Sequence, residues 1–292
     1  MQKKALTTLF CYMLIHIVVH HAKAQSGKQD SRLQTEQHNI RANTWREGVW
    51  TTTFWIGQSA QKKVPGSSCN SKSAWEKDWV RAYGGYDHPT RRIGYRPAAF
   101  IPKQNPFYVA LPYNDLKDPK NAPKWIPWWK PGLGRWTSQV KGKWIAIQYK
   151  DRIAYAQWKD VGPWVTHDPE YVFGGKKHKG KAGLDVSPAV RDYLGMNGSG
   201  YTRWRFVEDH EVPDGPWLEY GDAKLLVLAA RQRHKLYSSN THENSSEKQR
   251  RLRRYFSGVT TQSSTDRITQ TATTRRDPTE LRQGYGMLQL MF

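Results

Sequence analysis

The sequence predicts a mainly β fold built as a small barrel, and three observations support this fold class. Short segments rich in β-branched and aromatic residues recur between turn signals over residues 49–207. One short stretch, in contrast, carries both start and stop signals of a helix. No segment repeats at a fixed period along the chain. Many short strands with a single short helix are typical of small barrels.

The predicted strands follow from alternation and composition. Residues 106–111 alternate Phe107, Val109 and Leu111 with Tyr108 and Ala110. Such a period of two is expected when one face of a strand is buried. Two further segments flank a polar turn at 150–152 and are predicted to pair as a hairpin. The predicted strands are residues 49–55, 106–111, 144–149, 153–158 and 201–207.

The one predicted short helix lies over residues 187–195. Ser187 is a favourable N-cap, and Pro188 suits the first helical position because its missing N–H has no partner there. Gly195 supplies the stop signal, since glycine readily adopts the left-handed conformation that ends many helices.

The N-terminus has the pattern of a secretory signal peptide. Lys3 and Lys4 precede a mostly apolar run over residues 5–19, and Ala22-Lys23-Ala24 matches a small-residue cleavage site. The run is short for a membrane span, which favours a cleaved signal over an N-terminal anchor. We therefore expect a secreted or periplasmic protein that is cut after Ala24.

Composition divides the rest of the chain into three parts. All 14 tryptophans lie between Trp45 and Trp217. We predict a linker over 25–44, a barrel domain with long loop insertions over 45–223, and a basic, largely disordered tail over 224–292. A helical pattern is present in Ala223–Lys235. The net charge of +21 indicates contact with anionic surfaces through the tail, or a solvated run of charge.

Two motifs indicate a family. Residues 153–164 read IAYAQWKDVGPW and residues 183–195 read GLDVSPAVRDYLG. The pair resembles the two signatures of RlpA-like and expansin/barwin-type double-psi β-barrels, in which a strand ends in Asp-x-Gly-Pro-aromatic and an Asp-hydrophobic-Ser segment opens a short helix. The resemblance covers roughly residues 50–207. It implies a six-stranded double-psi β-barrel related to lytic transglycosylases and family-45 endoglucanases.

The resemblance also implies two candidate catalytic residues. Asp160 matches the acidic residue of the first motif, and Asp185 matches an acidic residue in the polysaccharide groove of these families. Cleavage of a glycosidic bond needs a general acid, and either carboxyl group suits that role. The alternative is structural, because an Asp at a Gly-Pro turn accepts backbone N–H groups and an Asp before a helix often caps it.

Two departures from the family pattern weaken the enzymatic interpretation. Ile56 stands where endoglucanases carry a catalytic base, which argues against inverting hydrolysis of the cellulase type. Tyr108 stands where the transglycosylases carry a His. Four other side chains are candidates to replace the missing groups: Asp115, His167, Asp168 and Glu170.

Aromatic residues are the candidates for binding substrate. Indole faces stack on sugar rings while their N–H groups bond hydroxyls, although ordinary core or loop packing is the expected role of most of the 14 tryptophans. Trp158 and Trp164 flank Asp160 and are the best placed, followed by Tyr108 and by Trp128 and Trp129 of a Pro-rich stretch. His178, in the basic loop GGKKHKGK, is expected to contact anions rather than a metal.

Three functions remain open at this point. The first is a glycan-cleaving enzyme such as a peptidoglycan lytic transglycosylase, and the second is a non-catalytic wall-binding module of the expansin or barwin kind. In both of these cases the expected partner is a cell-wall glycan, peptidoglycan or another polysaccharide. The third, which the sequence favours least, is an exported protein whose basic tail binds anionic lipid or lipopolysaccharide. We expect no nucleic acid partner, no cofactor and no metal, since no metal-binding spacing is present.

Overall fold

The computed structural model describes residues 43–60, 70–239 and 250. The chain divides into two units, residues 1–237 and 238–292. Everything below concerns the first unit. The predicted signal peptide, most of the predicted linker and the tail beyond residue 239, apart from residue 250, lie outside the described residues.

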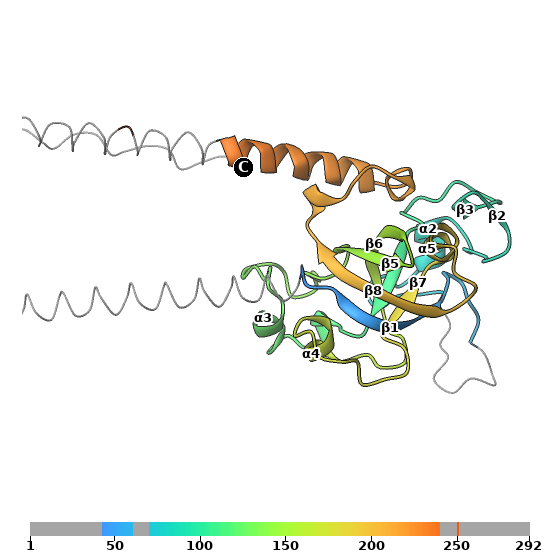
Figure 1. Ribbon diagram of the computed structural model, residues 1–292, viewed down its shortest axis with the longest axis horizontal. Helices are drawn as coiled ribbons and strands as arrows, with labels where there is room; N and C mark the ends of the chain where they lie inside the picture. The colour runs from blue at the N-terminus through green and yellow to red at the C-terminus, as the bar shows by residue number, and fades with distance from the viewer. Residues whose placement is uncertain (1–42, 61–69, 240–249, 251–292) are drawn as a thin grey trace, which may run out of the picture. The chain divides into compact units, whose positions relative to one another are not determined.

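Six strands close into a barrel, which confirms the predicted fold class (Figure 1). Around the barrel they follow the order β1-β7-β4-β6-β5-β8. Two of the neighbouring pairs, β1 with β7 and β4 with β6, are parallel, and the other four are antiparallel. The barrel strands are β1 (Arg46–Thr53), β4 (Tyr108–Leu111), β5 (Trp144–Tyr149), β6 (Arg152–Val161), β7 (Leu184–Val186) and β8 (Gly200–Val207).

The predicted strands agree with five of these six. The expected hairpin is present as β5 and β6, which pair from Tyr149 and Arg152 to Trp144 and Gln157. Strand β7 was not predicted because it has only three residues, too few to display a period of two. Its partners on both sides, β1 and β4, hold it in the sheet.

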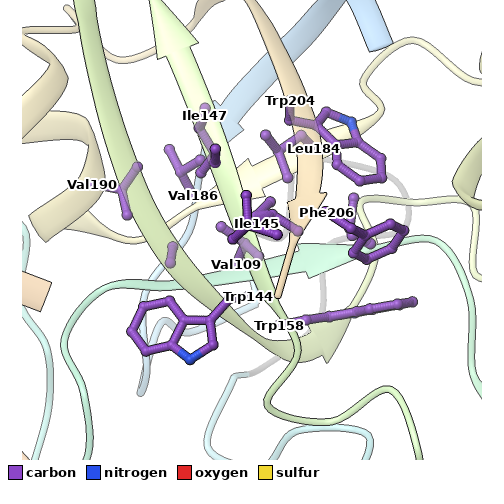
Figure 2. Packing of buried hydrophobic residues seen from close by; sticks show 14 of the residues in the cluster. Val109, Trp144, Ile145, Ile147, Trp158, Leu184, Val186, Val190, Trp204 and Phe206 are labelled. Carbon is purple, nitrogen blue, oxygen red and sulfur yellow. The ribbon is translucent and has the colours of Figure 1, made fainter. Parts of the chain in front are cut away.

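Alternate side chains of the strands fill the barrel, as Figure 2 shows for several of the strands. Val109 of β4 faces Trp158 of β6 and Val186 of β7 in the register. Ile145 and Ile147 of β5 lie opposite Phe206 and Trp204 of β8. All of these side chains are buried, so removing any one would leave a cavity that costs about 2–5 kcal/mol.

The described residues between β1 and β4 form a long insertion that covers the outer face of β4. Tyr108 and Ala110 of β4 point away from the barrel interior and pack against Phe54, Ile56 and Trp79. A two-stranded sheet of β2 (Arg92–Ile93) and β3 (Arg96–Pro97) belongs to the same insertion. This second core fixes the insertion above one side of the barrel.

The described residues contain more helix than predicted. The expected helix is present as α5 (Pro188–Leu194), with Ser187 accepting from the N–H of Val190 and Gly195 in the left-handed conformation. The expectation of only one short helix is wrong, because three others occur in the loops. They have four or five residues and so show no helical period. They are α2 (Trp79–Tyr83), α3 (Ala122–Trp125) and α4 (Pro169–Val172).

Residues 223–237 of the first unit lie in a further helix, in agreement with the pattern over Ala223–Lys235. Ala223 and Val227 of this helix join the main core. Three short 3-10 helices complete the described secondary structure: η1 (Asp115–Lys117), η2 (Asp209–Glu211) and η3 (Pro216–Leu218). None of the helices in the described residues is long and apolar enough to span a bilayer.

Candidate functional site

The two candidate catalytic residues lie in one row across neighbouring strands. In the register, Thr52 of β1 pairs with Asp185 of β7, Asp185 pairs with Ala110 of β4, and Ala110 pairs with Asp160 of β6. Side chains at paired positions point to the same side of a sheet. We call these four residues the carboxylate row.

The carboxylate row is on the outer face of the barrel. Val109, Leu111 and Val186, the neighbours of Ala110 and Asp185 along their strands, belong to the barrel core. Successive side chains of a strand point to opposite faces, so Ala110 and Asp185 point outward. Asp160 joins them because the register between β4 and β6 shifts by one residue between Val109 and Ala110.

Ala110 separates the two carboxylates. Neighbouring strands are about 4.8 Å apart, so the backbones of Asp160 and Asp185 are about 9–10 Å apart across β4. The methyl group of Ala110 is the smallest side chain that keeps a Cβ, and it is buried. Ala110 packs with Phe54, Ile56 and Trp79 in the second core, so the insertion covers the centre of the row between the two acidic side chains.

Asp160 is held by backbone N–H groups. Its Oδ1 accepts from the N–H of Ala74, in the insertion, and from that of Val161, both at 2.8 Å. Burial raises the pKa of Asp160 to about 6 against the effect of these two bonds, and the charge of Asp185 adds to the increase. A carboxyl group with this pKa is partly protonated near pH 6, as a general acid requires.

Asp185 has a hydroxyl partner instead. Thr52 Oγ1 donates to Asp185 Oδ1 across the parallel pair of β1 and β7. Burial again outweighs this bond and raises the pKa of Asp185 to about 6. The predicted alternative, a helix cap, is wrong for this residue, because the cap of α5 is Ser187.

Trp158 and Trp164 flank Asp160 in the chain, and the structure corrects the role expected of Trp158. Trp158 is 0% exposed and donates its Nε1–H to the carbonyl oxygen of Asp160 at 2.7 Å. It supports the end of β6 from within the core and presents no face to a ligand. Trp164 is 52% exposed and remains a candidate stacking residue.

Trp75 is a neighbour of Asp160 that the sequence did not indicate. Its ring lies 5.9 Å from that of Trp158, edge to face, and its backbone follows the Ala74 N–H that binds Asp160. The Trp75 Nε1–H is buried and has no hydrogen-bond acceptor in the described part of the chain. A buried donor without an acceptor is costly, and a ligand oxygen would satisfy it.

The expectation that Tyr108 binds substrate is also wrong. Its side chain is 1% exposed, and its hydroxyl group donates to Asp87 Oδ2 at 2.8 Å and accepts from the N–H of Ile56 at 3.0 Å. Ile56, at the position of the endoglucanase base, is buried in the same cluster. Both positions therefore hold the insertion onto β4.

Trp128 and Trp129 pack against the main core while remaining partly exposed. Trp128 donates its Nε1–H to the carbonyl oxygen of Gln139 and contacts Phe206 edge to face. Lys143 Nζ lies 4.4 Å from the centre of its ring. Trp128 is thus engaged by protein groups on several sides, which makes it a loop anchor.

The four replacement candidates are dispersed. Asp115 accepts from Ser138 Oγ and from the N–H of Gln139, which fixes a loop. His167 lies beside Tyr113, and Glu170 pairs with Lys176 at 3.0 Å. Asp168 is buried and holds His178. None of these side chains makes a hydrogen bond or ion pair with Asp160 or Asp185 in the described residues.

Comparisons with known proteins add little. No family model matches the chain, and no curated protein does. Among solved structures, Streptomyces papain inhibitor is similar at 13% identity and a TM-score of 0.26, over 57% of this chain and 97% of that one. A likeness this low supports no functional argument.

Proposed function

We propose that this chain is an exported cell-wall protein of the RlpA/expansin type that cleaves a polysaccharide at the carboxylate row. The observation that carries the proposal is the pairing of Asp160 and Asp185 with the same residue, Ala110, on one outer face. Two half-buried carboxyl groups with a raised pKa, two strands apart, match the machinery of glycoside cleavage.

The two carboxyl groups have different surroundings, which suggests different roles. Ionised Asp185 accepts the hydroxyl of Thr52 and, by its charge, favours the protonated form of Asp160. We assign Asp160 as the general acid that protonates the glycosidic oxygen. Asp185 stabilises the positive charge that develops on the sugar ring and takes the proton of the attacking group.

The attacking group decides the reaction class. In a lytic transglycosylase a hydroxyl of the substrate attacks internally, and the product is an anhydro sugar. In an inverting hydrolase a water molecule attacks between carboxyl groups about 6.5–9.5 Å apart. The separation of Asp160 and Asp185 across β4 also allows inverting hydrolysis, although Ile56 occupies the position of the endoglucanase base.

A second candidate function is binding of the glycan without cleavage. The observation that favours it is that each carboxylate also has a structural partner. Asp160 ties the insertion to β6 through Ala74, and Asp185 ties β7 to β1 through Thr52. In an expansin-like module the same row would bond sugar hydroxyls, and Trp75 and Trp164 would contact the ring.

The test is incubation of the mature protein with purified peptidoglycan and, separately, with plant and fungal wall polysaccharides at pH 5.5. Mass spectrometry of the soluble products distinguishes anhydro ends from reducing ends. The proposal predicts cleavage that is lost in Asp160→Asn and Asp185→Asn. Asp151→Asn is the matched control, because Asp151 is exposed in the β5–β6 turn.

Co-sedimentation with the same wall materials separates the remaining outcomes. Binding without soluble products in the wild type would favour the non-catalytic module. Neither binding nor cleavage with any of the polysaccharides would contradict both functions.

A further inference from the structure

A cavity of about 960 Å³ opens on the outer face of the barrel beside β1. Its walls come from β1, from the start of β8 and from the loop 174–183 between α4 and β7. We call it the basic cavity. The lining residues that matter below are Trp50, Lys177, His178, Lys181, Gly183 and Tyr201.

The charge of the basic cavity is positive. Lys177 and Lys181 are exposed, and neither has a carboxylate within ion-pair distance in the described residues. Lys176, which also lines it, pairs with Glu170 at 3.0 Å. Glu47 is the acidic residue of the lining and is engaged by Arg203 at 3.0 Å. Two ammonium groups are therefore available to an anionic ligand.

His178 gives an independent sign of a ligand. Its side chain is 7% exposed, and its Nδ1 is 3.0 Å from Asp168 Oδ2. The buried carboxylate accepts the Nδ1–H, which leaves a lone pair on Nε2. Burial lowers the pKa of His178, so the ring is neutral at pH 7. Nε2 is buried beside the backbone of Ala182 and makes no hydrogen bond of normal geometry in the described residues, although the ring lines the cavity.

Aromatic rings form another wall. Trp50 of β1 pairs with Tyr201 of β8, and the rings meet edge to face at 4.9 Å. Trp50 is partly exposed, and Tyr201 is 68% exposed. Aromatic faces beside hydrogen-bonding groups suit the apolar face of a sugar ring.

The basic cavity continues the face that carries the carboxylate row. Trp50 and Thr52 are two positions apart on β1 and share its outer face, about 7 Å apart along the strand. Gly183, at the other wall, donates its N–H to the carbonyl oxygen of Trp50 and precedes Asp185 by two residues. A chain of sugars that lies over Asp185 would therefore reach the cavity within a few units.

We infer that the basic cavity binds an acidic sugar unit of the polysaccharide, one that carries a carboxylate or sulfate group. The inference rests on the proposed function and adds the substrate class. Lys177 and Lys181 pair with the anionic group, the Nε2 atom of His178 accepts a hydroxyl of the sugar, and Tyr201 with Trp50 contacts the ring.

The position beside Asp185 favours a polysaccharide over a nucleic acid. A sugar polymer with one acidic unit in the cavity places neutral hydroxyl groups over the carboxylate row. A nucleic acid carries a charge on every phosphate, and the next phosphates would lie close to Asp185 and Asp160, where like charges repel.

The experiment is calorimetric titration of the full-length mature chain at pH 7 with four probes of similar length. Oligogalacturonate carries carboxylates, a heparin oligosaccharide carries sulfates, a cello-oligosaccharide is neutral, and a single-stranded RNA carries phosphates. At least one acidic oligosaccharide is expected to bind about tenfold more tightly than the neutral one, and the two acidic probes distinguish carboxylate from sulfate.

The test variant is the double substitution Lys177→Gln/Lys181→Gln. The matched control is Lys117→Gln/Lys120→Gln, because these two lysines are exposed and do not line the cavity. The first pair of substitutions is expected to lower the affinity for the acidic oligosaccharide about tenfold, because two exposed charge contacts are lost. Tyr201 is exposed and tolerates truncation. Tyr201→Ala is therefore expected to lower the affinity for the acidic oligosaccharide without changing the charge of the cavity.

The inference is overturned if the first pair behaves like the control, if neutral and acidic probes bind equally, or if RNA is the tighter ligand with the same sensitivity to the lysines. Its failure differs from failure of the proposed function. If a neutral wall polysaccharide is still cleaved in an Asp160-dependent way, the proposed function stands while the acidic substrate class does not.

Discussion

The carboxylate row and the basic cavity share one outer face of the barrel, yet burial acts on them in opposite senses. In the row, burial raises the pKa of Asp160 and Asp185 to about 6 and favours the neutral, protonated acid. In the cavity, burial lowers the pKa of His178 and favours the neutral base. In both places the buried group tends to lose its charge.

The difference shows what each region is able to do. A neutral carboxyl group donates a proton, so the row is suited to chemistry. In the cavity the buried ring becomes a hydrogen-bond acceptor, and the charge is left to the exposed lysines, so the cavity is suited to binding. The following predictions separate the two regions.

The largest effect is expected in the row. Asp160→Asn keeps the oxygen that accepts from Ala74 and Val161 but removes the proton donor. We expect the rate of glycan cleavage to fall by at least about 100-fold, with little change in affinity, since general acid catalysis contributes that much. Steady-state assays of cleavage, with calorimetry for binding, measure both quantities. A parallel loss of affinity and rate would indicate a binding role for Asp160 instead.

Salt is expected to act on the cavity and not on the row. Raising the ionic strength from 50 mM to 500 mM should lower the affinity for an acidic oligosaccharide about tenfold, because exposed charges are screened. The affinity for a neutral oligosaccharide should stay within a factor of two. Calorimetry at both salt concentrations tests this, and an equal loss for both ligands would remove the charge-based distinction.

Several elements of this comparison were predictable from the sequence. The strand period identified β4 and β5, and the cap residues Ser187 and Gly195 identified α5. Asp160 and Asp185 were found through their motifs. The sequence did not indicate that both residues pair with Ala110, because this pairing depends on the short β7 and on a register shift in β6.

The aromatic residues were the least predictable part. A period of two would place Trp158 and Asp160 on the same face, but the register shift between them turns Asp160 outward while Trp158 stays in the core. Trp75, 85 residues before Asp160 in the chain, reaches the site through a long insertion whose path no local pattern indicates.

The stability of the protein should depend on pH through the row. A carboxyl group whose pKa is raised by folding stabilises the folded state below its unfolded pKa, about 3.9, and this contribution is lost as pH rises through about 6. Asp160→Asn is therefore expected to raise the free energy of unfolding by about 1 kcal/mol at pH 8 and to have no such effect at pH 3.

Urea denaturation at the two pH values measures the difference, with Asp151→Asn as the control. Destabilisation by Asp160→Asn at pH 8 would mean that the carboxylate is stabilised as an ion, which contradicts its assignment as the acid.

The smallest effect concerns Thr52. Thr52→Val removes the hydroxyl group that donates to Asp185, so the pKa of Asp185 is expected to rise further, by less than about one unit. The limb of the pH–rate profile that reports ionised Asp185 should move to higher pH. Thr53→Val is the matched control, because Thr53 donates to the carbonyl oxygen of Gly198 and lies outside the row. Equal profiles for both variants would separate Asp185 from the reaction.

The central claim is that one ligand covers both the row and the cavity. Hydrogen–deuterium exchange of the full-length chain, with and without an acidic oligosaccharide of about six units, tests it most directly. We predict slower exchange at the amides of Ala74 and Val161, which bind Asp160, and also in the loop 174–183. Protection of the loop alone, or of neither segment, would contradict a single binding face.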